Sequence, residues 1–202
     1  MAEWIYMEKD GVHIFDLAKT AAQLQQAYNA AYELGKTGKT LVVVGTKRQA
    51  REVIQEAAKA HKVPFITSRW LGGLLTNWEQ VKKSLKKMVD IEEGLKTDKY
   101  SKYTKYERLQ LDKERGRLER FFAGIRDLKS APDALFVVDV GAERIAVKEA
   151  TNTGVFTMGV VDTNANPDAV DLVIPANDDG RKSLQYVVET VLKGYAAGRD
   201  AK

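Results

Sequence analysis

The positions of apolar residues divide the chain into short strands and longer helices. Continuous apolar runs occupy residues 41–44 and 134–138, shorter ones occupy 63–66 and 172–174, and a mainly apolar strand is predicted at 155–161. Runs of this kind are typical of parallel strands that are buried on both faces. Helical segments separate them, so the pattern predicts a three-layer α/β domain with a mostly parallel sheet and right-handed crossovers.

Local signals predict how several elements begin. An extended pair at residues 4–6 and 12–15 flanks a turn, and Asp16 is placed to cap a helix that reaches Leu34. Asn177 is predicted to cap the last helix in the same way. Three further helix starts fit the capping-box pattern, in which a Thr is followed three residues later by Glu or Gln. These predicted boxes are Thr46 with Gln49, Thr76 with Glu79, and Thr104 with Glu107.

Between residues 76 and 128 the alternation of strand and helix is interrupted. Two helical segments here carry apolar residues only in a narrow heptad stripe, and charged residues occupy their other faces. Such a pair is expected to fold back as an antiparallel coiled-coil hairpin that projects from the body. We therefore predict a globular domain at 1–75 and 129–202 with an inserted hairpin at 76–128. The stripe consists of Trp78, Val81, Leu85, Met88 and Leu95, then Leu111, Leu118, Phe121, Ile125 and Leu128.

The segment Arg-Trp-Leu-Gly-Gly-Leu-Leu-Thr-Asn-Trp at 69–78 joins the body to this hairpin. Its diglycine permits backbone angles that a β-carbon would forbid, and its tryptophans are suited to anchor a packed turn. We interpret the segment as a structural junction that sets the direction of the hairpin. The predicted junction residues are Trp70, Gly72, Gly73, Thr76 and Trp78.

The positive charge is concentrated in the predicted hairpin. Residues 82–127 contain 14 Lys and Arg against nine Asp and Glu, a net charge of +5, whereas the whole chain carries +4. Around the predicted tip, a Lys-Tyr unit recurs every three residues between Lys99 and Tyr106. Lysines suit phosphates and tyrosines suit exposed bases, so the pattern favours RNA, although a solvated charged helix surface has the same composition.

Composition excludes several classes of site. With no cysteine in the chain, a disulfide framework, a thiolate zinc site, an iron–sulfur cluster and a cysteine nucleophile are all excluded. No apolar run approaches the roughly 20 residues that span a bilayer, and the N-terminal residues do not resemble a signal peptide. We therefore expect a soluble, cytoplasmic protein without a membrane partner.

No catalytic set can be assembled from the motifs. Residues 45–48, Gly-Thr-Lys-Arg, place an anion-binding pattern at a helix start but lack the spacing of a phosphate-binding P-loop. Asp139 and the Asp-Thr-Asn at 162–164 follow strands and could bind magnesium or act as acid and base, yet these residue types also favour ordinary turns. We expect no enzyme, no cofactor and no metal. A phosphate-ligand-binding α/β enzyme is the alternative.

Six ordered segments together resemble one known family. They are Asp-Gly-Val-His-Ile-Phe-Asp-Leu at 10–17, Val-Gly-Thr-Lys-Arg at 44–48, Arg-Trp-Leu-Gly-Gly-Leu-Leu-Thr-Asn at 69–77, Pro-Asp-Ala-Leu-Phe-Val-Val-Asp at 132–139, Val-Val-Asp-Thr-Asn at 160–164 and Ile-Pro-Ala-Asn-Asp-Asp at 174–179. With these motifs the chain resembles the bacterial-type small-subunit ribosomal protein S2 family. This sequence departs from the family pattern in beginning without the usual N-terminal segment, which includes Gly-His-Phe-Gly-His, and in ending without the charged tail of many relatives. The resemblance therefore does not extend to contacts that the N-terminal segment would make.

The resemblance implies a flavodoxin-like sheet with a coiled-coil hairpin and a structural role on the ribosome without catalysis. It implies contacts with ribosomal RNA of the small subunit and with neighbouring small-subunit proteins, among them the large ribosomal protein S1, and no homo-oligomer is expected. A hairpin that acts mainly as a protein-docking arm is a further alternative. The residues predicted to bind RNA are Thr46, Lys47, Arg48, Arg69, Asn77, Lys82, Lys83, Lys86, Lys99, Lys102 and Lys105.

Overall fold

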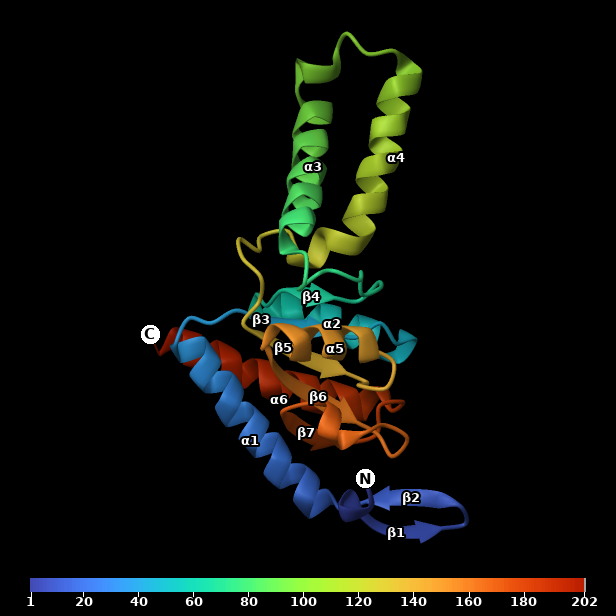
Figure 1. The fold of residues 1–202 in the computed structure, drawn as a ribbon, viewed down its shortest axis with the longest axis vertical. Coiled ribbons are helices and arrows are strands. Elements are labelled where there is room, and N and C mark those ends of the chain that lie inside the picture. The colour runs from blue at the N-terminus through green and yellow to red at the C-terminus, as the bar shows by residue number, and fades with distance from the viewer. Residues whose placement is uncertain (202) are drawn as a thin grey trace.

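The centre of the molecule is a five-stranded parallel sheet with the strand order β4-β3-β5-β6-β7 (Figure 1). The computed structural model describes residues 1–201 and every side chain in that range except that of Asp98. Helices cover both faces of the sheet, which confirms the predicted three-layer α/β fold. The strands are β3 (Leu41–Val44), β4 (Phe65–Ile66), β5 (Ala134–Val138), β6 (Phe156–Val161) and β7 (Leu172–Pro175).

Alternate residues of the strands enter two separate apolar cores. Leu41, Val43 and Phe136 point to the face covered by α1 (Leu17–Lys36), α2 (Arg48–His61) and α6 (Arg181–Asp200). Val42, Val44 and Leu135 point to the opposite face, against α5 (Arg144–Thr153) and the junction. All six side chains are fully buried. This double burial explains why the strands read as uninterrupted apolar runs.

The two longest helices, α1 and α6, lie side by side along one flank of the body (Figure 1). Their backbones approach closely where glycines of α6 face α1. A β-carbon on Gly198 would collide with the backbone carbonyl of Tyr32, and one on Gly194 would crowd Tyr28. The first helix of the body is therefore packed against its last.

The N-terminal elements extend away from the body. Strands β1 (Ile5–Lys9) and β2 (Val12–Phe15) pair antiparallel, as predicted, at the end of the molecule opposite the helical hairpin (Figure 1). The predicted cap of α1 is also confirmed, because Asp16 accepts hydrogen bonds from the backbone N–H groups of Ala18 and Lys19. The 3-10 helix Ala2–Trp4 precedes β1, and another 3-10 helix, Pro167–Ala169, lies between β6 and β7 of the body.

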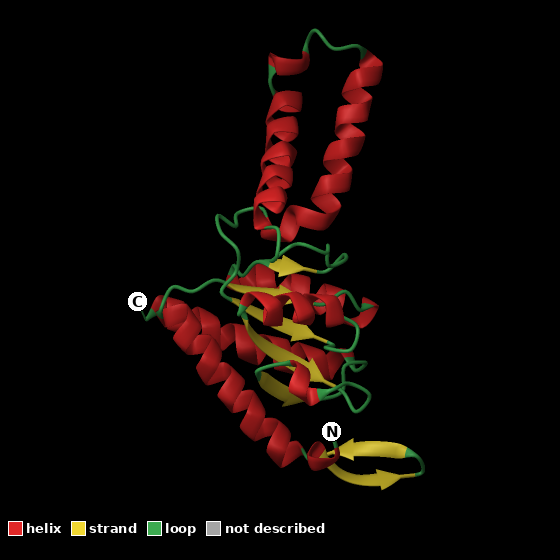
Figure 2. Cartoon of the chain, viewed as in Figure 1, coloured by secondary structure: helices red, strands yellow, loops and turns green. Residues whose placement is uncertain are grey.

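The predicted hairpin is formed by α3 (Trp78–Lys96) and α4 (Lys105–Phe122), which run in opposite directions and project from the body (Figure 2). A 3-10 helix at Asp98–Tyr100 lies near the turn. The seam is one-sided, because α3 buries Val81, Leu85, Met88 and Ile91, while Phe122 is the single apolar side chain of α4 that is buried.

The second hairpin helix is shorter than the heptad pattern predicts. It ends at Phe122 and is followed by the 3-10 helix η3 (Ala123–Ile125), so Leu128 lies outside the helix. Gly124 is packed so closely on the edge strand that a β-carbon there would collide with the carbonyl oxygen of Phe65. The chain turns at this contact, and η3 covers the outer edge of β4.

Only one of the three predicted capping boxes forms. Thr104 and Glu107 make both reciprocal hydrogen bonds at the start of α4. The helices α2 and α3 instead begin one residue later than predicted, with Lys47 and Asn77 at the N-cap positions and no side-chain cap. The Asn177 prediction was also wrong, because α6 begins after Gly180 and the Asn177 side chain accepts bonds from Asp179 and Gly180 in the preceding turn.

Candidate nucleic-acid interface and its support

A single buried carboxylate holds the junction between the sheet and the hairpin. Glu149, on α5, accepts hydrogen bonds at Oε1 from the indole Nε1 of Trp70 at 3.2 Å and from the backbone N–H of Gly73 at 2.8 Å. Its Oε2 accepts from the backbone N–H of Leu75 at 3.1 Å and of Thr76 at 3.5 Å. Trp70 and Glu149 are both buried. Donors spread over seven residues of the junction thus converge on one side chain of the body.

These hydrogen bonds keep Glu149 ionised. Burial alone would raise the pKa of the Glu149 carboxyl, but the bonds donated by Gly73, Leu75 and Trp70 outweigh burial, and the pKa is lowered. The sequence analysis missed Glu149, because nothing in a helical segment of mixed polarity distinguishes a buried glutamate from an exposed one. The Glu149 carboxylate also explains why the predicted capping box at Thr76 does not form, because the Thr76 backbone N–H and hydroxyl both lie within 3.5 Å of it.

The two junction glycines differ in their roles. Gly73 has a φ of +92°, a backbone conformation that side chains with a β-carbon rarely adopt. Gly72 has no positive φ, and a β-carbon there would meet only Glu149 Oε1, at an ordinary distance of 3.9 Å. Of the two glycines, only Gly73 adopts a backbone conformation that a β-carbon would disfavour. Trp78 is half-buried and packs against the core cluster below the hairpin.

The hairpin carries cations that have no acidic partner among the described side chains. Lys82, Lys83 and Lys86 on α3 are exposed and form no ion pair within that set. Four acidic residues of the hairpin are paired with other cations, for example in the pairs Lys87–Glu114 at 2.6 Å and Arg126–Glu92 at 2.7 Å. Positive charge on the outer surface is thus left available to an anionic partner.

The tip of the hairpin has a defined structure. The rings of Tyr100 and Tyr103 pack with their centroids 5.0 Å apart, and the Lys99 ammonium lies 5.7 Å from the Tyr100 centroid. Lys102 and Lys105 are exposed beside them. Because the Thr104–Glu107 capping box fixes the start of α4, these cations and rings are presented from an ordered surface.

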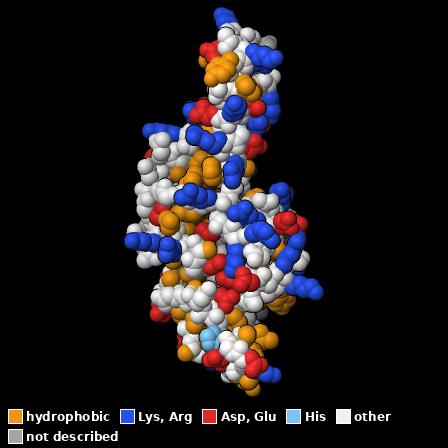
Figure 3. Space-filling view, turned by 90° about the vertical axis from the view of Figure 1, so that its right-hand side faces the viewer, with side chains coloured by type: hydrophobic (Ala, Val, Ile, Leu, Met, Phe, Trp, Pro, Cys, Tyr) orange, Lys and Arg blue, Asp and Glu red, His pale blue; other side chains and the backbone are white. Residues whose placement is uncertain are grey.

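Cations also cover the part of the body next to the hairpin. In the face shown in Figure 3, Lys and Arg side chains are spread over the hairpin and the adjoining body, with Asp and Glu interspersed. Arg69 and Arg48 are both exposed and follow the carboxyl ends of the neighbouring strands β4 and β3. Asn77 is also exposed, at the N-cap position of α3. These three residues and the hairpin lysines have side chains that a partner can reach.

Thr46 and Lys47 occupy a different environment. Lys47 Nζ lies 2.5 Å from Asp178, 2.7 Å from Asp179 and 3.4 Å from Asp139, and the backbone N–H of Thr46 donates to Glu143 at 2.7 Å. This cluster sits beyond the carboxyl end of β3, beside β5, where the strand order reverses. Open parallel sheets commonly bind small ligands at that position. Here the chain's own lysine and carboxylates fill it.

Burial and ion pairing have opposite effects on the pKa values of this cluster. Burial raises the pKa of the Asp178 carboxyl to about 6, and its ion pair with Lys47 opposes this rise. Burial also opposes the charged form of Lys47, but hydrogen bonds to Asp178 and Asp179 outweigh it and raise the pKa of Lys47. The Asp162 carboxylate accepts from the backbone N–H of Asp178 at 3.1 Å. Within residues 1–201 no group of three or more acidic or histidine side chains is arranged to hold a metal ion.

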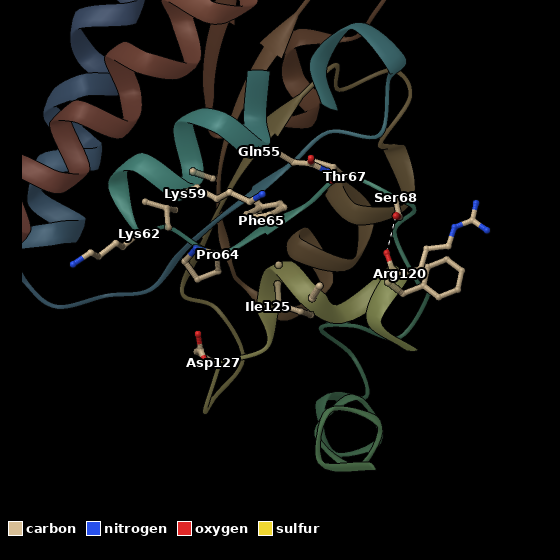
Figure 4. A pocket seen from close by; sticks show the side chains of 15 residues that line it. Gln55, Lys59, Lys62, Pro64, Phe65, Thr67, Ser68, Arg120, Ile125 and Asp127 are labelled. Carbon is tan, nitrogen blue, oxygen red and sulfur yellow. Dashed lines mark hydrogen bonds between the residues drawn. The ribbon is translucent and has the colours of Figure 1, made fainter. Parts of the chain in front are cut away.

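A cavity of about 580 Å³ lies at the root of the hairpin, between α2, β4 and η3 (Figure 4). Ser68 Oγ donates to the backbone carbonyl of Arg120 at 2.7 Å across it, and Gln55 donates to Thr67 at 2.9 Å. The Lys62 and Arg120 side chains point away from one another and out of the cavity in this view. These two cations therefore do not converge on a common point inside the cavity.

In this α/β body the crevice that commonly binds ligands is filled, and the body carries a basic hairpin. These two features define a class of protein that presents a charged arm rather than a small-molecule pocket. None of the helices in the described chain is long and apolar enough to cross a membrane. The family model for ribosomal protein S2 matches residues 1–198, and the chain belongs to that family. The resemblance inferred from the sequence motifs is thereby confirmed.

Curated relatives agree with the family match over nearly the whole chain. The small ribosomal subunit protein uS2 of Cytophaga hutchinsonii is 45% identical over 194 residues, which cover 96% of this chain and 76% of the relative. The protein of the same name from Chlorobium chlorochromatii is 42% identical over 202 residues, covering 100% and 80%. That of Flavobacterium johnsoniae is 42% identical over 198 residues, covering 98% and 78%.

Proposed function

We propose that this protein is a structural component of the small ribosomal subunit, where it binds ribosomal RNA and neighbouring ribosomal proteins. The observation that carries the proposal is the family match over residues 1–198, together with relatives that are named small ribosomal subunit proteins. Binding to other ribosomal proteins, including S1, is part of the proposal, and the same family membership supports it. No catalytic role is part of the proposal.

Charge and exposure divide the predicted RNA-binding residues into two groups. The exposed lysines of the hairpin, with Arg48, Arg69 and Asn77, are the group available to phosphates. Lys47 and the backbone of Thr46 are engaged by carboxylates of the body, so we assign them to the support of this surface rather than to the contact itself. The hairpin at 76–128 then acts as an inserted arm on the domain formed by 1–75 and 129–202.

The enzyme alternative is disfavoured by one observation. A phosphate-binding enzyme on this sheet would need the crevice beyond β3, but three carboxylates surround Lys47 there. Negative charge at this density repels a phosphate ligand. A thermal-shift screen with sugar phosphates and nucleotides should therefore show no stabilisation of the full chain.

Sedimentation tests the proposal directly. The tagged full chain should co-sediment with small subunits at physiological salt, and a chain found entirely free would contradict the proposal. For RNA contact, the logarithm of the binding constant should fall linearly with the logarithm of salt concentration, by roughly 0.7 to 0.9 for each phosphate contact.

A matched pair of triple variants identifies the surface involved. Replacement of Lys82, Lys83 and Lys86 by alanine should flatten the salt dependence, because these lysines would no longer displace counterions. The control replaces three exposed lysines of the body, Lys36, Lys39 and Lys148, and should leave the slope unchanged. Equal slopes for both triple variants would remove the face of α3 from the RNA interface.

A further inference from the structure

The tip of the hairpin leaves a row of large apolar side chains in solvent. Tyr103, which precedes α4, and Tyr106 and Leu109 within it are spaced three residues apart, with 46%, 69% and 50% of their surfaces exposed. Together with Leu95 they line an open cavity of about 1020 Å³ between the two helices. Adjacent exposed apolar side chains of this size mark a surface that a partner covers.

Charge around this row indicates the chemistry of the partner. Lys105 and Arg108 line the cavity, Lys99 and Lys102 are exposed nearby in sequence, and none of these four cations forms an ion pair with a described side chain. Asp112 also lines the cavity, but its carboxylate is paired with Arg115. The nearest acidic residue in sequence, Glu107, is committed to the capping box with Thr104. A partner that fits must therefore combine negative charge with flat apolar surfaces, and unpaired nucleotides offer both in phosphate and base.

The aromatic rings differ in what they can still contact. Tyr103 already packs against Tyr100, whereas no hydrogen bond or ring contact involving Tyr106 is found among the described residues. Tyr106 is the second residue of α4, immediately after the capped start of the helix. Its ring is therefore held on an ordered helix with its surface open, which reduces the entropy lost when a base stacks on it.

We propose that Tyr106, flanked by Tyr103 and Leu109, stacks on unpaired bases of a single-stranded RNA segment whose phosphates lie against Lys105 and Arg108. This inference rests on the proposed function and specifies the kind of RNA that the tip contacts. Bases in a duplex are stacked on one another and cannot reach the ring, so the tip is selective for loops, bulges or single strands.

A binding experiment on the full chain tests the stacking role. The probes are a fluorescently labelled oligoadenylate of about ten nucleotides, which matches the length that single-strand binding surfaces cover, and a blunt RNA duplex of the same length. Tyr106→Ala should weaken oligoadenylate binding by about 5- to 100-fold, the range measured when a stacking residue is removed. It should leave duplex binding and the salt dependence unchanged, because stacking displaces no counterions.

Matched variants separate stacking from charge and from folding. Tyr186→Ala on α6 removes a tyrosine of the same 69% exposure, far from the hairpin in sequence, and should bind as the unmodified chain does. Tyr106→Phe keeps the ring and should retain affinity within about twofold, whereas Lys105→Ala should lower the salt slope. Circular dichroism should show unchanged helicity for Tyr106→Ala, since no described hydrogen bond is lost.

Two results would overturn the inference without contradicting the proposed function. In the first, Tyr106→Ala binds oligoadenylate normally while Lys105→Ala still lowers the salt slope, which leaves a purely electrostatic tip. In the second, Tyr106→Ala binds RNA normally but no longer enters the subunit, which assigns the ring to a protein contact. An unmodified chain that binds neither probe and fails to co-sediment would contradict both proposals.

Discussion

The carboxylate of Glu149 accepts a hydrogen bond from the indole of Trp70, 3.2 Å away, and so joins helix α5 to the segment that leads into the hairpin. The two residues are 79 positions apart in sequence. The same carboxylate binds three backbone N–H groups of that segment. The direction of the hairpin therefore depends on one side chain of the body, that of Glu149.

Glu149→Gln is expected to destabilise the junction almost as much as Glu149→Ala. A glutamine supplies one acceptor oxygen, and its NH₂ group would face N–H donors that the second carboxylate oxygen now satisfies. Loss of buried charge-assisted hydrogen bonds should lower the free energy of unfolding by about 2–4 kcal/mol, as measured by chemical denaturation. Lys148→Gln, an exposed substitution in the same helix, should change it by less than about 0.5 kcal/mol. If Glu149→Gln and Lys148→Gln changed the free energy of unfolding equally, this result would contradict the role of Glu149.

Gly73→Val should impair incorporation into the small subunit more than the loss of any single lysine. The φ of +92° at Gly73 would strain a β-branched residue by about 1–3 kcal/mol and shift the start of α3. The measurement is the fraction of chain that co-sediments with subunits at equal expression. Gly72→Ala is the matched control, since its β-carbon has room. Equal incorporation of Gly73→Val and Lys83→Ala would refute the prediction.

The acidic cluster predicts a characteristic pH dependence of stability. The folded protein raises the pKa of Asp178 to about 6 from an ordinary value of 3.8, so between these values the folded state holds this proton more tightly than the unfolded state. The contribution of Asp178 to stability is therefore largest below about pH 4 and declines as the pH rises through 6.

Asp178→Asn isolates that contribution. The unfolding free energy of the unmodified chain minus that of Asp178→Asn should decrease by about 1–3 kcal/mol between about pH 4 and pH 7. Urea denaturation at several pH values measures the unfolding free energies of both proteins. A difference that rises with pH would mean that the pair with Lys47 outweighs burial.

Gly198→Ala should destabilise the fold although alanine is the better helix former. A β-carbon at this position would collide with the backbone of Tyr32, so α1 and α6 would have to separate. Overpacking of this kind costs about 1–3 kcal/mol, which exceeds the gain of about 1 kcal/mol in helix propensity. Thermal unfolding should show a lower midpoint for Gly198→Ala than for Gly116→Ala, where a β-carbon meets open space. A higher midpoint for Gly198→Ala would contradict this packing.

The sequence allowed the fold to be predicted in most of its elements, because buried parallel strands such as 134–138 carry their signal in consecutive residues. The hairpin was predictable for the same reason, since its heptad stripe is local. Helix starts were less predictable. The Thr104 box formed where the chain is exposed, whereas the Thr46 and Thr76 boxes did not form, because a carboxylate from a distant segment binds the backbone there.

For the candidate site, the sequence allowed only exposure and charge to be predicted. The hairpin lysines could be named from composition, but the engagement of Lys47 by Asp178 joins residues 131 positions apart and leaves no local pattern. The same holds for Glu149 and Trp70. Such contacts depend on the strand order of the sheet, which brings the ends of β3, β5 and β7 to one edge.

The packing of α1 against α6 has a consequence for how the protein is made. During synthesis α1 leaves the translating ribosome long before α6, and until α6 follows, the apolar residues of α1, α2 and the sheet that pack against α6 lack that cover. The core on that face can close only after the 144 residues between α1 and α6 have been translated. Until then the nascent chain exposes apolar surface of the kind that chaperones bind and that favours aggregation.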